Sequence, residues 1–185
     1  MIIAPKSKLL KQRQGNAPTI VQILPAMVRG GVERGTVEMT DAIQKHGGRA
    51  IVISRGGPMV RHLDRLGATH YQLDVHTKNP FCWPQIRRQL KAILSRENAD
   101  LVHVRSRVPA WIALPAAAAL GIATVSTVHG RFIALSALKR IYNCKLLKTD
   151  HVIAISNHVK DLITRQYVDV EKRLTVVHRG VDIDS

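Results

Sequence analysis

A glycine pair near residue 30 suits this chain to bind a phosphate group. Gly30 and Gly31 follow an apolar run and stand directly before a helical pattern that carries Glu33 in its first turn. Free backbone N–H groups and the helix dipole attract a phosphate to such a position. The alternative interpretation is a turn that needs a positive φ at glycine.

Two known glycine-rich nucleotide-binding motifs do not match this loop. Dinucleotide-binding loops need Gly-x-Gly-x-x-Gly, but Val32 and Glu33 stand two residues after Gly30 and Gly31. Gly30 and Gly35 have the separation of the NTPase P-loop, but that motif needs a lysine where this chain carries Thr36. The loop therefore has little support as a dinucleotide-binding loop, and it is not the P-loop of an NTPase.

Two arginines flank a hydroxyl in a second candidate loop, Arg105-Ser106-Arg107, which also follows an apolar run. The planar guanidinium group binds phosphates and carboxylates through paired hydrogen bonds. An anionic ligand would suit these side chains. The alternative is a solvated loop with no ligand.

A histidine begins a third loop, His129-Gly130-Arg131. Its ring can contact a sugar hydroxyl or serve as a satisfied structural histidine. Two later positions follow further apolar runs: Ser156 is placed as the N-cap of a helix, and Arg179 precedes a glycine. The chain shows no nucleophile elbow, zinc-binding helix or Ser-His-Asp arrangement.

The elements that must position these loops are strands and helices in alternation from Thr19 onward, which indicates βα units and a parallel sheet. Most apolar runs are nearly continuous in Val, Ile and Leu, as expected when helices cover both faces. All the loops above follow strands, and open α/β sheets bind ligands at that edge. The predicted strands are Thr19–Leu24, Ala50–Ser54, His70–Leu73, Leu101–Val104, Ala123–Val128, His151–Ile155 and Leu174–Val177.

Segments with helical periodicity lie between these predicted strands. One helix is predicted over Val32–His46, with a C-cap at Gly47-Gly48 and with Val32, Met39 and Ile43 on its inner side. Another is predicted over Pro84–Arg96; it buries Ile86, Leu90, Ile93 and Leu94 and leaves Arg87, Arg88 and Lys91 outside. A third is predicted to begin behind Ser156, ahead of the apolar residues Val159, Leu162 and Ile163.

The stretch from Val108 to Val128 carries no charge and is long enough to cross a bilayer as a helix. It contains two prolines and a glycine, however, and its second half becomes β-branched. A buried helix followed by a buried strand explains it better. We therefore predict a doubly wound, Rossmann-like α/β domain over residues 18–185, with about seven parallel strands and helices on both faces, preceded by a flexible basic tail over residues 1–17.

The charge is strongly positive: 28 Lys and Arg against 13 Asp and Glu give a formal net charge of +15. This excess favours an anionic partner, whether nucleic acid, membrane surface or phosphate-bearing substrate. Cys82 and Cys144 have neither disulfide-scaffold nor zinc-site spacing, which favours a reducing cytoplasm. Met1 to Ala4 is too short for a secretory signal. We expect neither a cofactor nor a metal.

Five short motifs in order resemble the N-terminal half of a GT-B glycosyltransferase, in particular the retaining family 4 with its many lipopolysaccharide and cell-envelope enzymes. They span about residues 19 to 182 and read Gly30-Gly31-Val32-Glu33, Asp100-Leu101-Val102-His103-Val104-Arg105-Ser106, Thr127-Val128-His129-Gly130, Val152-Ile153-Ala154-Ile155-Ser156 and Arg179-Gly180-Val181-Asp182.

This resemblance implies roles for the matching positions. His129 would touch the transferred sugar near its reacting carbon and is the candidate catalytic residue. Donor phosphates would lie in the cleft near Gly30, Gly31, Glu33, Ser156 and Arg179, although many members carry Asn where this chain has Arg179. The acceptor side would be lined by Arg105, Ser106, Arg107, Gly130 and Arg131.

The resemblance also implies a donor domain that these residues do not contain. Family 4 enzymes carry a Glu-x7-Glu pair and an Arg-Lys pair in a second Rossmann domain, and no two glutamates here have that spacing. We therefore expect that this chain alone is inactive, since the missing half would supply most of the transition-state stabilisation. The nucleotide-sugar donor would bind mainly to that half, and a glycan or lipid-linked acceptor to this one.

Two further functions stay open. A non-catalytic module could dock on an anionic membrane or a partner chain, because Pro84–Arg96 and Leu135–Lys148 are amphipathic and cationic. Such contact would place the cytoplasmic protein on the inner face of the membrane. Nucleic-acid binding would fit the sequence pI near 10.6, but aromatic residues are only 4% of the chain, and we expect no nucleic-acid partner.

Overall fold

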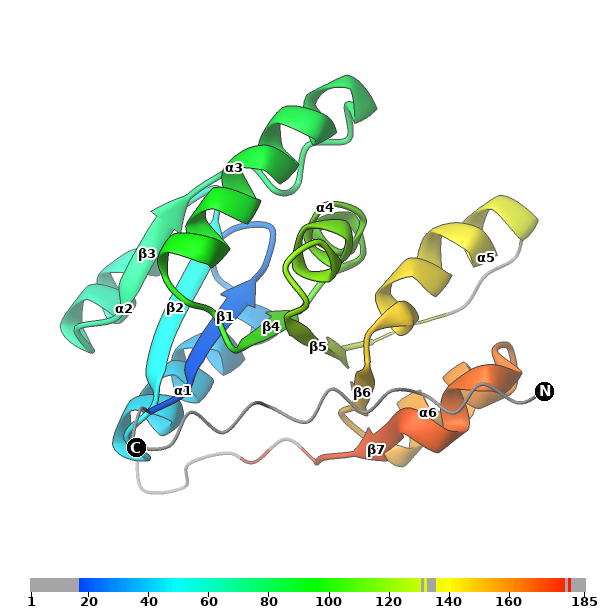
Figure 1. Ribbon diagram of the computed structural model, residues 1–185. Coiled ribbons are helices and arrows are strands. Elements are labelled where there is room, and N and C mark those ends of the chain that lie inside the picture. The colour runs from blue at the N-terminus through cyan, green and yellow to red at the C-terminus, as the bar shows by residue number, and fades with distance from the viewer. Residues whose placement is uncertain (1–16, 131, 133–135, 179, 181–185) are drawn as a thin grey trace.

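Seven parallel strands form one sheet in the order β3-β2-β1-β4-β5-β6-β7 (Figure 1). The computed structural model describes residues 17–130, 132, 136–178 and 180. The predicted strand number and parallel arrangement are confirmed, and each strand begins and ends within one residue of its prediction. The strands are β1 Thr19–Ile23, β2 Arg49–Ser54, β3 Thr69–Gln72, β4 Leu101–Val104, β5 Ala123–Val128, β6 His151–Ala154 and β7 Leu174–Val176.

Central strands are apolar on both faces because helices cover both. In β2, consecutive residues Ile51, Val52 and Ile53 are all fully buried. Ile51 and Ile53 belong to the larger core cluster, whereas Val52 belongs to a smaller cluster on the other face. A helix layer on each side therefore removes the whole strand from water.

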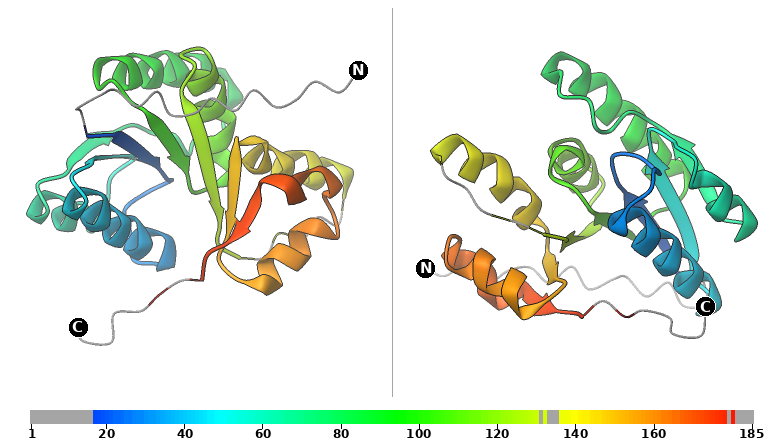
Figure 2. Two further views of the ribbon diagram at one scale, coloured as in Figure 1. Left: turned by 60° about the horizontal axis from the view of Figure 1, so that its bottom comes forward. Right: turned by 180° about the vertical axis from the view of Figure 1, so that it is seen from behind.

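The helices divide unequally between the two faces (Figure 2). The helices α1 and α2 pack over the smaller core, and α3 to α6 lie over the larger one. The α-helices are α1 Gly31–Lys45, α2 Val60–Arg65, α3 Trp83–Arg96, α4 Arg107–Ala118, α5 Ala137–Cys144 and α6 Asn157–Thr164, and the short 3-10 helices are η1 Pro80–Cys82, η2 Lys145–Lys148 and η3 Val168–Arg173.

The inner side of α1 is more polar than its sequence indicates. Thr36 and Thr40 are buried together with Ile43, whereas Met39 is 39% exposed. The buried Gln22 of β1 explains this, because its amide donates to the Thr36 carbonyl at 3.2 Å and to the Thr40 hydroxyl at 2.9 Å. The prediction that Met39 faces inward is wrong. The C-terminal glycine is as expected, since Gly47 follows the helix with φ +77°.

The other predicted helices are confirmed with small changes. In α3, Ile86, Leu90 and Leu94 are buried as predicted, but Ile93 is only partly buried. Arg87, predicted outside, is only partly exposed. The uncharged stretch folds as α4 and β5, as predicted. Among the described residues, no helix is long and apolar enough to cross a membrane.

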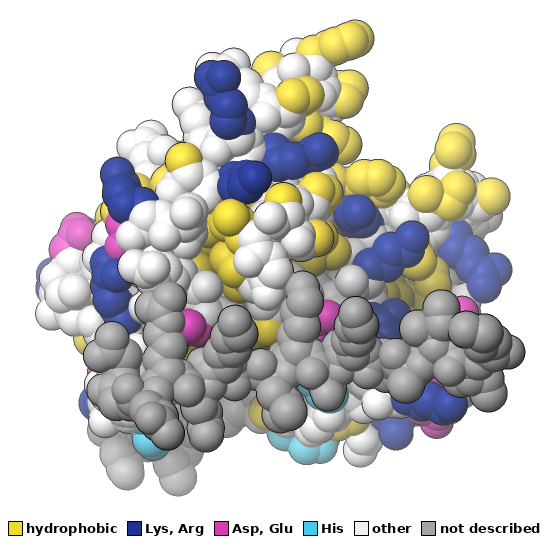
Figure 3. All heavy atoms as spheres, viewed as in Figure 1, with side chains coloured by type: hydrophobic (Ala, Val, Ile, Leu, Met, Phe, Trp, Pro, Cys, Tyr) yellow, Lys and Arg dark blue, Asp and Glu magenta, His cyan; other side chains and the backbone are white. Residues whose placement is uncertain are grey.

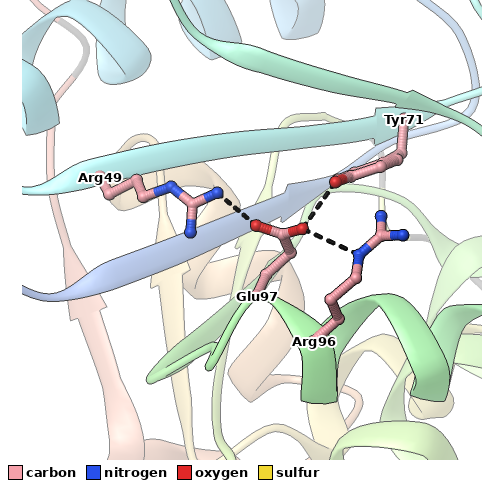
Figure 4. Close-up of polar contacts among 4 residues, drawn as sticks. All are labelled: Arg49, Tyr71, Arg96 and Glu97. Atoms are coloured by element: carbon pink, nitrogen blue, oxygen red, sulfur yellow. Dashed lines mark hydrogen bonds and ion pairs between the residues drawn. The ribbon is translucent and has the colours of Figure 1, made fainter.

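A cluster of four polar side chains joins β2, β3 and the end of α3 (Figure 4). Glu97 follows α3, accepts a hydrogen bond from the Tyr71 hydroxyl at 2.6 Å and one from Arg96 at 3.2 Å, and pairs with Arg49. The Tyr71 hydrogen bond is the largest effect that lowers the pKa of Glu97; burial opposes it, and the two arginines lower that pKa further. Arg49 begins β2, so the cluster lies away from the carboxyl edge of the sheet.

Candidate functional site

The order of the strands places the loops after β1 and β4 side by side. These strands pair directly, with Ile23 opposite Val104. The chain leaves β1 toward α1 on one face and leaves β4 toward α4 on the other. A crevice opens at the carboxyl edge where neighbouring connections diverge, and open α/β sheets bind ligands there.

A polar cavity of about 230 Å³ lies at this edge on the α4 side. Two arginines and a histidine bring positive or polar groups to it, and Ser106 and Thr127 contribute hydroxyls. Its lining residues are Arg105, Ser106, Arg107, Thr127, Val128, His129, Gly130, Phe132 and Leu146. No carboxylate occurs among these described lining residues, so the cavity suits an anionic group.

A second cavity, of about 500 Å³, lies on the α1 side and is mostly apolar. Met39 opens onto it, which accounts for the exposure of that side chain on α1. The lining residues are Gly35, Glu38, Met39, Ala42, Arg105, Thr127, His129, Ile153, Ile155, Val177, His178 and Gly180. Three residues, Arg105, Thr127 and His129, line both cavities and therefore stand between them.

A buried histidine, His103, contacts Thr127, one of the three residues that line both cavities. His103, two residues before Arg105 in β4, is 4% exposed, and its Nε2 lies 2.7 Å from the Thr127 hydroxyl. Burial lowers the pKa of His103 well below its ordinary value, and the positive charges of Arg105 and His129 lower it further. The ring is therefore neutral near pH 7 and fixes the position of Thr127 without adding charge.

Arg105 and Arg107 are held in different ways. Arg105 is buried, and its backbone N–H donates to the Ile23 carbonyl of β1 at 3.0 Å. Arg107 begins α4 and places its guanidinium over the Phe132 ring, 5.0 Å from the centroid. Ser106 stands at the N-cap of α4, yet its side chain forms no capping hydrogen bond with the described residues.

The predicted donor-side residues lie apart from the two cavities. Gly30 and Gly31 begin α1, and the Glu33 carboxylate folds back against the Gly30 α-carbon. Gly30 is extended, with φ 173°, so the interpretation of this loop as a turn with positive φ is wrong. Ser156 caps α6, as predicted, and accepts from the Val159 N–H at 3.2 Å. Among the described residues, none of these four lines either cavity.

Three predictions concern residues outside the described part of the chain. Arg131 and Arg179 are both outside it, as is the tail over residues 1–17 apart from Ala17. Gly130, between His129 and Arg131, is described and lines the polar cavity.

Sequence reasoning missed two residues that position groups at this edge of the sheet. His103 could have been found from alternation, because strand residues two apart point to the same face. Gly57, after β2, could have been found as half of a second glycine pair at a strand end. Its φ is +143°, and a Cβ there would meet the Met27 backbone in the loop after β1. The Met27 N–H also donates to the Gly56 carbonyl at 2.9 Å, so the two loops are fixed together.

Comparisons with known proteins agree with this geometry. A family model described as Glycosyltransferase Family 4 matches residues 29–185. A glycosyltransferase from Rickettsia africae is similar at 37% identity with a TM-score of 0.80, over 91% of this chain and 45% of that chain. The HepE protein of Anabaena, solved with UDP-glucose, matches at 16% identity and a TM-score of 0.74, over 90% and 45%.

Sucrose-phosphate synthase from Thermosynechococcus elongatus matches at 14% identity with a TM-score of 0.68, over 91% of this chain and 49% of that one. At these lower identities the likeness concerns the fold. A search of curated protein sequences gives no match. The chain thus spans about half the length of the solved proteins it resembles.

Proposed function

Because the chain belongs to glycosyltransferase family 4, we propose that it is the acceptor-side half of a retaining glycosyltransferase. The reaction transfers a sugar from a nucleotide-sugar donor to lipopolysaccharide or another envelope glycan. It takes place in the cytoplasm, at the inner face of the membrane where a lipid-linked acceptor is found.

The observation that carries this proposal is the group of residues shared by the two cavities. Arg105 and His129 face a polar, cationic cavity on one side and a larger apolar cavity on the other. An acceptor phosphate or carboxylate suits the polar cavity, because Arg105 and Arg107 can bind it through paired hydrogen bonds. His129 then lies between the acceptor and the second cavity, where it contacts the transferred sugar.

The donor is a nucleoside-diphosphate sugar in this proposal. The HepE structure was solved with UDP-glucose, which supports this class of donor. In this proposal the helix N-terminus at Gly30 and Gly31 faces the diphosphate, and Glu33, Ser156 and Arg179 are the other residues assigned to the donor phosphates. A second domain supplies most of the donor contacts and most of the charge stabilisation during transfer.

Binding and transfer can be tested separately. Titration calorimetry with a phosphorylated lipopolysaccharide-core oligosaccharide should detect binding by the chain, and Arg107→Gln should weaken it about tenfold or more, as loss of one charged hydrogen-bonding partner implies. An equal affinity for the dephosphorylated oligosaccharide would contradict the anionic acceptor.

Transfer from UDP-glucose, followed with radiolabelled sugar, should be undetectable with residues 1–185 alone. For the binding measurement with Arg107→Gln, the matched control is Arg61→Gln on α2. This variant removes one exposed charge on the opposite face and should leave oligosaccharide binding unchanged. Measurable transfer by this chain would show that it is not merely the acceptor-side half.

A further inference from the structure

Helix α5 presents its apolar side chains to solvent and buries a polar one. Leu138 is 81% exposed and Ile141 is 60% exposed, and Tyr142 also lies on this outer side. Positions three and four apart share one helix face, so these three form a continuous apolar strip. The buried residue of α5 is Asn143. A helix that only covered the core would show the opposite arrangement.

Aromatic contacts extend this strip to the start of α3. Trp111 of α4 stacks on Trp83, with ring centroids 6.0 Å apart, and Lys145 of η2 lies over the Trp111 ring at 5.3 Å. Phe81, in η1 two residues before Trp83, is 91% exposed. Figure 3 shows apolar side chains gathered over the N-terminal ends of α3 and α5, with Lys and Arg side chains between them.

Positive charge surrounds these apolar groups, and negative charge is scarce in the sequence that forms them. No Asp or Glu occurs in residues 75–96 or in residues 101–148. Burial lowers the pKa of Lys145, and the nearby charges of Lys148 and Arg87 lower it further, so cations from α3 and η2 lie close enough to repel one another. An anionic partner would relieve this repulsion.

A groove of about 590 Å³ runs beside α5 and continues the strip inward. Trp111, Ile141 and Leu147 line its apolar part, and Arg140, Lys145 and Lys148 lie around it, with Asp169 as the acidic residue of the lining. A ligand with an anionic head and an apolar tail fits this combination better than a purely ionic one.

We propose that the basic apolar surface formed by Phe81, Trp83, Trp111, Leu138, Lys139, Ile141, Lys145 and Lys148 docks the protein on an anionic lipid bilayer. Apolar and aromatic side chains enter the interfacial region while lysines contact phosphate headgroups. Helices α3 and α5 follow β3 and β5 and therefore begin at the carboxyl edge of the sheet, so docking through their N-terminal ends would bring the polar cavity near the membrane. This inference names the surface that contacts the membrane and the class of lipid it binds, and it rests on the proposed function only for the lipid-linked acceptor.

The combination of lysines with exposed apolar side chains fits a bilayer better than a nucleic acid. A nucleic acid offers phosphates to the cations but no apolar region in which Leu138 and Ile141 could be buried. A lipid bilayer offers both. The two tryptophans of the chain both belong to this surface, so intrinsic fluorescence reports directly on its environment.

The test is co-sedimentation of the purified chain with vesicles of neutral phosphatidylcholine or of phosphatidylcholine mixed with phosphatidylglycerol, together with tryptophan emission. Anionic vesicles should bind the protein and shift its emission to shorter wavelength. The double variant Lys139→Gln/Lys148→Gln should bind about 30-fold more weakly, and added salt should weaken the wild type. Leu138→Ser/Ile141→Ser should lose about tenfold or more, and since both side chains are exposed the variant should keep its melting temperature.

The matched control is Arg61→Gln/Arg65→Gln on α2, which removes the same charge from exposed positions on the opposite face. It should bind anionic vesicles as the wild type does. An equal loss in this control would mean that overall charge, not this surface, drives binding. Equal binding to neutral vesicles, no binding to either kind, or capture by duplex DNA in preference to anionic vesicles would overturn the proposal. None of these measurements requires sugar transfer, so failure here leaves the proposed reaction intact.

Discussion

Replacing Glu97 by Gln should weaken the fold without touching the candidate site. The Tyr71 hydroxyl donates to the Glu97 carboxylate at 2.6 Å, and hydrogen bonds to a charged partner contribute about 1.5–3 kcal/mol. Arg49 and Arg96 are 50% and 64% exposed, so each pairing contributes only about 0–1 kcal/mol after solvent screening. Gln keeps one acceptor oxygen but loses the charge. We therefore expect Glu97→Gln to lower the free energy of unfolding by about 1–2 kcal/mol.

Urea denaturation at pH 7, followed by circular dichroism, measures this loss. A cycle with Tyr71→Phe should show a coupling energy of about 1 kcal/mol, because the two side chains share one hydrogen bond. Asp41→Asn is the control: it breaks the exposed pair with Lys45 and should cost less than about 0.5 kcal/mol. A Glu97→Gln loss no larger than that control, or no coupling to Tyr71, would refute the reasoning.

The same comparison has a defined pH dependence. The pKa of Glu97 is lowered in the folded protein from an ordinary value of 4.5. The stabilisation from its charge is therefore fully present above pH 4.5 and is lost as the pH falls through the folded-state pKa. The wild type and Glu97→Gln should converge in stability as acid is added. A difference that persists after Glu97 is protonated would mean that the carboxylate charge is not its source.

Two other substitutions test the supports of the site. Gly57→Ala should cost about 1–3 kcal/mol in urea unfolding, because φ is +143° and the new Cβ meets the Met27 backbone; Gly67→Ala, with φ +66° and open space around it, should cost less, and equal losses would show that the contact with Met27 is unimportant. The lowered pKa of His103 means that stability is present above the ordinary value of 6.5 and falls as the pH drops below it. Between pH 6.5 and 5, stability should therefore fall more steeply in the wild type than in His103→Gln, and parallel curves would contradict the buried neutral ring.

Strands were predictable from this sequence because their signal is local. Continuous apolar runs such as Ile51–Ile53 are typical of strands that are covered on both faces, and here their ends are marked by glycine or polar residues. The site loops were predictable for the same reason, since Arg105 and His129 directly follow such runs. That they meet depends on the pairing of β1 with β4 and of β4 with β5, which follows from the doubly wound topology.

Polar packing was not predictable in the same way. Thr36 and Thr40 occupy the inner side of α1 because Gln22 lies opposite, and this partnership joins residues that periodicity treats as unrelated. The partners of His103 are likewise on another strand. The outward-facing strip on α5 is amphipathic in sequence, but periodicity does not tell which side of a helix meets the sheet.

The joined loops after β1 and β2 bear on how a ligand is bound. Met27 donates to the Gly56 carbonyl and accepts from the Met59 N–H at 2.8 Å, so its backbone is ordered before any ligand arrives. Ordering a backbone residue loses about 1–2 kcal/mol of conformational free energy. Because this segment is already ordered by folding, a ligand that binds in the crevice beside it does not have to order it, and its affinity is higher for the same contacts.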